Sequence, residues 1–98
     1  MIMDKNNVTK ILVEREGYTE KRAILLASEC QNISKELRPL FEKWLYDASA
    51  KDDFTTHGYS LLDMMQQRGM HYLAALLDMD WLLKEPEKAK PVIDSFMK

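Results

Sequence analysis

Residues Met70 to Leu83 read M-H-Y-L-A-A-L-L-D-M-D-W-L-L, and only His71, Asp78 and Asp80 interrupt this apolar run. A surface helix keeps one broad polar face, whereas a helix that is apolar nearly all round is buried in a core or spans a membrane. A membrane span needs about 20 apolar residues, so a shorter run is more typical of a core helix. The stretch therefore predicts a buried central helix over 70–83.

The three polar residues of this stretch fall on two sides of the predicted helix. His71 and Asp78 are seven residues apart and share one edge, but about 10 Å of helix axis separates them, which is too far for a direct pair. Asp80 lies on the opposite side, and Lys84 follows it at the i, i+4 spacing of a helical ion pair. We expect the acidic residues here and in the loops to be solvated.

The composition bounds the fold class. Of the 98 residues, 46% are hydrophobic and 31% charged, which is ordinary for a globular protein and too apolar for disorder. Three glycines and three prolines favour helices with short connections over a β-sandwich. We expect one all-α domain over 1–98, a small bundle of five to six short helices around the central one. The first residues, 1–6, are expected to fray, and 50–57 to form a polar connection.

Apolar spacing and capping residues predict the other helices. The first four predicted starts follow an amide or hydroxyl side chain of the kind that caps helices, and the last helix begins at a proline. The expected helices are 8–16 after Asn7, 20–30 after Thr19, 35–49 after Ser34 and 61–68 after Ser60, followed by a turn at 86–90 and a last helix over 91–97. The segment 54–56 is β-prone, and as a strand it would need another chain or the N-terminal segment as its partner.

Two segments of the chain share a pattern. Gly17-Tyr18-Thr19 and Gly58-Tyr59-Ser60 each precede a helical region that ends in Trp-Leu, at Trp44-Leu45 and Trp81-Leu82. The pattern fits an old duplication, or two uses of one device made of a glycine stop, a packing tyrosine and a hydroxyl cap. We favour the second interpretation.

The stretch from Ile11 to Leu45 also resembles ubiquitin-associated domains. Those are three-helix modules with a Gly-aromatic loop after the first helix and a Trp-Leu or similar pair near the end of the third. Gly17-Tyr18 and Trp44-Leu45 stand in these two places. Glu16 stands where the family has methionine, and the second connection is longer than the family pattern. The resemblance implies a three-helix arrangement for this part of the chain.

Chemical motifs are absent from the sequence. It has no Cys-x-x-Cys, no His-x-x-x-His and no glycine-rich phosphate loop. Cys30 lies on an apolar helix face, where a buried, reduced thiol is expected. We therefore expect no catalytic residues, no bound metal and no cofactor, and we expect the protein not to be an enzyme. The lone cysteine and the lack of an apolar signal core in M-I-M-D-K-N-N favour a cytoplasmic location and no membrane association.

Partners are the remaining question. A domain of this size cannot easily bury a helix on every side, so either the remaining helices cover the central helix fully or a second copy of the chain or another protein covers part of it. Methionines suit an adaptable contact surface as well as a core. The candidate interaction surface comprises Met64, Met65, Met70, Tyr72 and Trp81. We expect a non-catalytic protein-interaction module that forms a homodimer.

The alternative hypothesis is a DNA-associated regulator that uses the helical hairpin at 61–83, which has the lengths of a helix-turn-helix. Its second helix offers tyrosine, leucine and alanine, and it lacks the Arg, Asn and Gln that usually read bases. The net charge of −2 also leaves no visible basic face for phosphate binding. Nucleic acid is therefore the less favoured partner.

Overall fold

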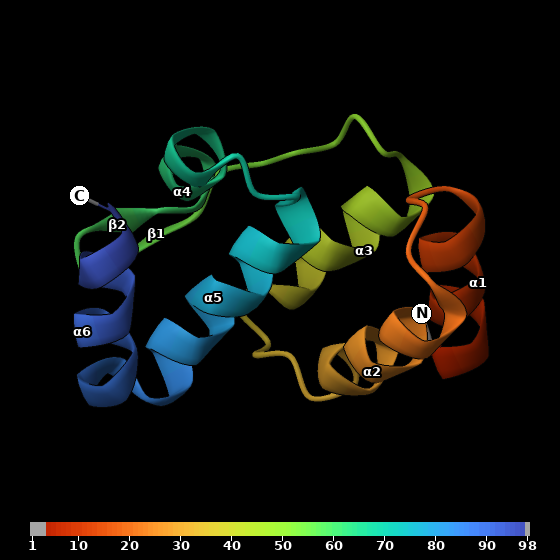
Figure 1. The fold of residues 1–98 in the computed structure, drawn as a ribbon, viewed down its shortest axis with the longest axis horizontal. Helices are drawn as coiled ribbons and strands as arrows, with labels where there is room; N and C mark the ends of the chain where they lie inside the picture. The colour runs from red at the N-terminus through yellow and green to blue at the C-terminus, as the bar shows by residue number, and fades with distance from the viewer. Residues whose placement is uncertain (1–3, 98) are drawn as a thin grey trace. The chain divides into compact units, whose positions relative to one another are not determined.

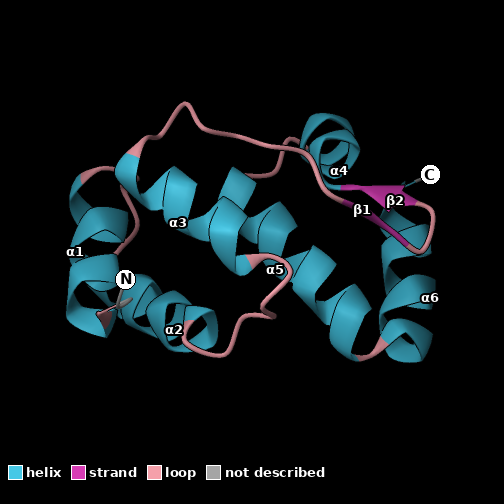
Figure 2. Ribbon diagram, turned by 180° about the vertical axis from the view of Figure 1, so that it is seen from behind, coloured by secondary structure: helices cyan, strands magenta, loops and turns pink. Residues whose placement is uncertain are grey.

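The computed structural model describes the backbone of residues 4–97 and the side chains of residues 4–95. Within this range the chain forms six α-helices and one two-stranded sheet (Figures 1 and 2), so the all-α prediction is confirmed. The elements in chain order are α1 (Lys5–Glu14), α2 (Glu20–Cys30), α3 (Arg38–Tyr46), β1 (Thr55–Thr56), β2 (Tyr59–Ser60), α4 (Leu61–Arg68), α5 (Tyr72–Lys84) and α6 (Pro86–Met97). The chain divides into two compact units, and the boundary lies between Ile33 and Ser34.

The first unit is a hairpin of α1 and α2. Gly17 adopts a left-handed conformation (φ 78°) after α1, and the Tyr18 N–H donates to the Leu12 carbonyl at 3.0 Å, which closes the helix end as predicted. The buried side chains of the two helices are Val8, Leu12, Ala23, Leu26, Ala27 and Cys30. The buried thiol agrees with the prediction for Cys30.

The start predicted for α1 is wrong, and that of α2 is confirmed. Helix α1 begins at Lys5 because Asp4, not Asn7, caps it by accepting the Asn6 N–H at 3.0 Å. Helix α2 begins after Thr19, whose hydroxyl accepts the Arg22 N–H at 3.2 Å.

The second unit is organised around α5, which contacts both α4 and α6 (Figure 1). Seven of its thirteen residues are buried, so the prediction of a buried central helix is confirmed, although the helix begins two residues later than expected. These residues are Tyr72, Leu73, Ala75, Leu76, Met79, Asp80 and Leu82.

Helix α3 is shorter than predicted. It runs from Arg38 to Tyr46, and Ser34 to Leu37 form a turn before it. Pro39 sits in its first turn, where the missing N–H costs nothing. The helix ends where Asp47 becomes extended (φ −146°, ψ 105°). Of the three helices expected from the ubiquitin-associated resemblance, α3 therefore belongs to the second unit.

The sequence left open whether 54–56 forms a strand, and the structure has one at Thr55–Thr56. Its partner is the nearby β2 and not another chain or the N-terminal segment, which corrects the expected pairing. Thr55 pairs with Ser60 and Thr56 with Tyr59 in an antiparallel hairpin. His57 and Gly58 form the turn with φ values of 52° and 82°. Two positive φ values define the turn whose twist suits a two-residue hairpin. A histidine followed by glycine is a weaker signal for it than Asn-Gly, so the hairpin was missed.

The turn predicted at 86–90 is wrong, because α6 begins at Pro86. The Glu85 carbonyl accepts the N–H groups of Lys88 (3.1 Å) and Ala89 (2.9 Å), which closes the first helical turn. Ala89 and Ile93 are then buried one turn apart. Pro91 lies inside the helix, not at its start. The side chains of Phe96 and Met97, part of the predicted apolar stripe, lie outside the described residues.

Candidate functional site

A tight corner joins α4 to α5. Gly69 ends α4 with a left-handed backbone (φ 62°), and the Met70 N–H donates to the Met65 carbonyl at 3.1 Å. His71 is extended and occupies the N-cap position of α5. This corner aligns the end of α4 with the first turn of α5 and leaves Met65 and Met70 half-exposed.

The start of α4 is fixed by two side chains. Ser60 accepts the Asp63 N–H at 3.2 Å, so it caps the helix as predicted. Asp53, expected to be a solvated loop charge, accepts the Leu62 N–H at 3.0 Å and the Ser60 hydroxyl at 2.9 Å. Slight burial raises the pKa of Asp53, but these bonds and those from Phe54 and Leu61 outweigh it, so the pKa lies below its usual value.

Tyr72 holds the N-terminal end of α5. Its hydroxyl donates to the Asp52 carbonyl at 2.9 Å, and its ring lies 6.1 Å from that of Trp44 in α3. Trp44 in turn lies 6.3 Å from Phe41. Burial, followed by the charges of Asp52 and Asp53, raises the pKa of Tyr72 to about 12. The phenol therefore stays protonated and keeps this bond at any ordinary pH.

Asp80 holds the C-terminal half of α5. We expected a solvated charge, but this side chain is buried, with 7% of its surface exposed. Its carboxylate accepts both the backbone N–H (2.8 Å) and the hydroxyl (2.5 Å) of Ser34, and it pairs with Lys84 at 2.9 Å. The Asp80–Lys84 ion pair predicted from sequence is confirmed. The Ser34 side chain therefore holds α5 instead of capping α3.

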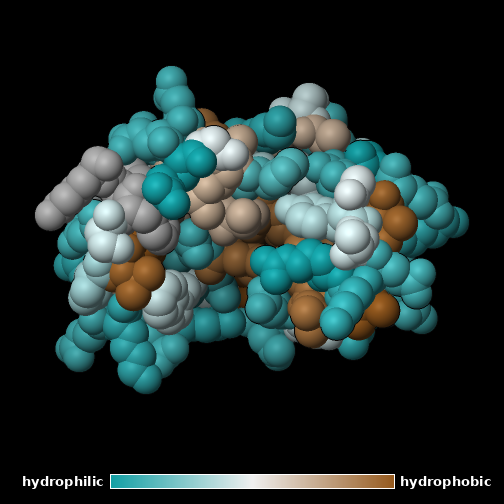
Figure 3. All heavy atoms as spheres, viewed as in Figure 1, coloured by the Kyte–Doolittle hydropathy of each residue, from teal (hydrophilic) through white to brown (hydrophobic). Residues whose placement is uncertain are grey.

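One face of α5 is not fully covered. Figure 3 shows apolar side chains at the surface along this helix. The half-exposed residues recur at the spacing of one helix face. We name this face the α5 stripe, and it consists of Met70, Ala74, Leu77, Asp78 and Trp81. Because the spacing is i, i+4, i+7, i+8 and i+11, the five side chains form one continuous surface.

Asp78 is the one carboxylate in the α5 stripe. It is half-buried between apolar neighbours, and among the residues that the structure describes no group forms a hydrogen bond or ion pair with it. Burial alone raises the pKa of Asp78 above its ordinary value. The α5 stripe thus combines apolar area with one acceptor that lacks a donor.

The structure divides the interaction surface predicted from sequence. Met65, Met70 and Trp81 are half-exposed. Met64 and Tyr72 are buried in the core, so they cannot contact a partner. Sequence reasoning missed Leu77 and Asp78. The helical spacing of Met70, Ala74, Leu77 and Trp81 could have indicated this face, but the uniformly apolar sequence hides which side of the helix is left open.

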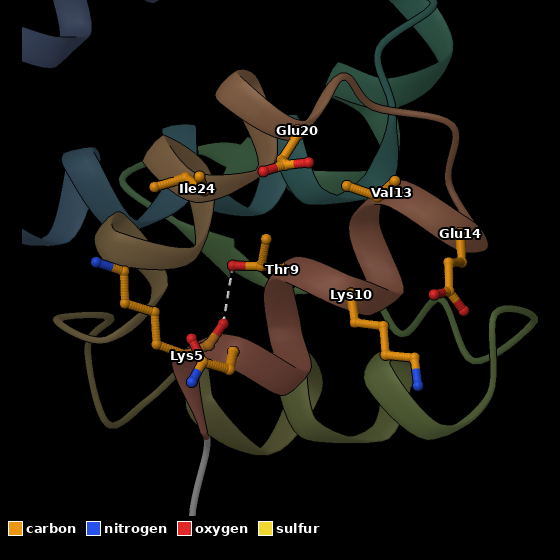
Figure 4. A pocket seen from close by; sticks show the side chains of 8 residues that line it. Lys5, Thr9, Lys10, Val13, Glu14, Glu20 and Ile24 are labelled. Carbon is orange, nitrogen blue, oxygen red and sulfur yellow. Dashed lines mark hydrogen bonds between the residues drawn. The ribbon is translucent and has the colours of Figure 1, made fainter.

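A second surface feature is a shallow groove of ≈ 500 Å³ between α1 and α2 in the first unit (Figure 4). Helix α1 contributes Lys5, Asn6, Thr9, Lys10, Val13 and Glu14 to its lining, and α2 contributes Glu20 and Ile24. The Thr9 hydroxyl donates a hydrogen bond to the Lys5 carbonyl at 2.9 Å. The two lysines and two glutamates are spread around the groove and do not converge on one point (Figure 4).

Within 4–97 no three His, Cys, Asp or Glu side chains gather as metal ligands would. No described helix combines the length and apolar character that a membrane crossing requires.

The surface of α5 differs from that of a DNA-reading helix. The helices α4 and α5 and their short turn have helix-turn-helix lengths, but a recognition helix must expose the residues that enter the groove. Buried residues make up more than half of α5, and its open face presents methionine, alanine, leucine, aspartate and tryptophan. An aspartate in the middle of that face would lie toward phosphates of the same charge.

Comparison of this chain with protein-family models, curated proteins and solved structures finds no match in any of the three. The function must therefore be argued from the surface of this molecule.

Proposed function

We propose that this protein is a non-catalytic protein-interaction module that associates with itself through the α5 stripe, and that it works in the cytoplasm. The observation that carries the proposal is the half-exposed apolar face on the helix that forms the core of the second unit. Continuous apolar surface on an otherwise charged protein is a feature of contact sites. The buried, single Cys30 suits a reducing compartment.

The first experiment measures the solution mass by light scattering after size exclusion, across a wide range of protein concentrations. Self-association predicts a mass that rises from one chain toward two as the concentration increases. Trp81→Ala removes the largest side chain of the α5 stripe and should shift this transition to higher concentration.

Tyr46→Ala is the matched control, because Tyr46 is an aromatic residue of α3 with 67% of its surface exposed and lies outside the α5 stripe. It should leave the transition unchanged. A mass of one chain at every concentration would contradict the proposal, and a mobility shift with duplex DNA at low salt would favour the alternative regulator.

A further inference from the structure

We draw no further inference here: the strongest candidate, the half-exposed apolar face of α5 around the carboxylate of Asp78, belongs to the surface already described, and nothing in the structure shows which residues of a partner cover it.

Discussion

Asp78 shows how a single residue can oppose the folding of its own chain. Its carboxylate is half-buried without a hydrogen-bond donor in the described residues, and burial raises its pKa. A folded-state pKa above the unfolded value means that the folded state binds the proton more tightly. The free energy of unfolding therefore decreases as pH rises from about 4 through the raised pKa. At neutral pH the chain carries the full cost of the ionised side chain.

Asp78→Asn should therefore raise the free energy of unfolding at pH 7. Urea denaturation at protein concentrations low enough to avoid association measures this effect. The difference from the parent chain should shrink toward pH 3, where the carboxyl group is protonated in both folded and unfolded states. An unchanged or lower stability at pH 7 would show that the half-buried charge has a partner after all.

Tyr72 makes the opposite contribution at high pH. Its pKa of about 12 lies above the usual value of 10, so the stability that its protonated form provides is present at neutral pH and is lost as pH rises from about 10 to 12. Tyr72→Phe removes the bond to the Asp52 carbonyl and should cost about 1 kcal/mol at pH 7. Because the pKa values of Tyr18 and Tyr59 are also raised, the test compares unfolding at pH 8 and 12 in both chains. The difference in free energy of unfolding between the parent chain and Tyr72→Phe should be smaller at pH 12 than at pH 8.

At the scale of elements, a hydroxyl cap predicted the starts of α2 and α4. Thr19 and Ser60 were identified because a hydroxyl before an apolar run is a local pattern, and α2 and α4 begin where expected. Asp4, Asp53 and Asp80 were not assigned their bonding roles. The contact between Ser34 and Asp80 spans 46 positions, and no spacing in the sequence indicates it.

The hairpin and α6 were mispredicted for a different reason. Pro86 and Pro91 both suit the first turn of a helix, and the sequence predicts the start at Pro91, whereas the helix begins at Pro86. The buried positions of Ala89 and Ile93 supply the tertiary contacts that retain this segment as one helix. The preference of proline for the first turn of a helix does not indicate which residues of the segment become buried.

Asp53 links the hairpin to α4, and its removal tests that link. Asp53→Ala should lower the free energy of unfolding by about 1 kcal/mol, as loss of a capping side chain usually does. Because the pKa of Asp53 is lowered in the folded state, its contribution is present above about pH 4 and is lost as pH falls below that. The variant should therefore differ from the parent chain at pH 7 and approach it near pH 2. Asp63→Ala is the control for Asp53→Ala, because it also removes a carboxylate, in this case from the first turn of α4.

At the scale of the whole molecule, the sequence predicted that the helix within 70–83 is central but not which side of it stays open. That side is set by where α4, α6 and the hairpin fall on α5, and these positions depend on long-range packing that periodicity does not encode. The candidate surface was therefore partly identified, with Met65, Met70 and Trp81 half-exposed and Met64 and Tyr72 buried.

Two adjacent leucines of α5 separate folding from association. Leu76 is fully buried, and Leu76→Ala should lower the free energy of unfolding by about 2–5 kcal/mol through the cavity it creates. That is a large share of the roughly 5–15 kcal/mol that stabilises an ordinary domain. Leu77 is half-exposed in the α5 stripe, so Leu77→Ala should cost clearly less in urea denaturation. The same Leu77→Ala chain should need a higher concentration to dimerise in light scattering. If Leu77→Ala instead destabilised the monomer as much as Leu76→Ala and left the dimer intact, the α5 stripe would be part of the core and not a contact surface.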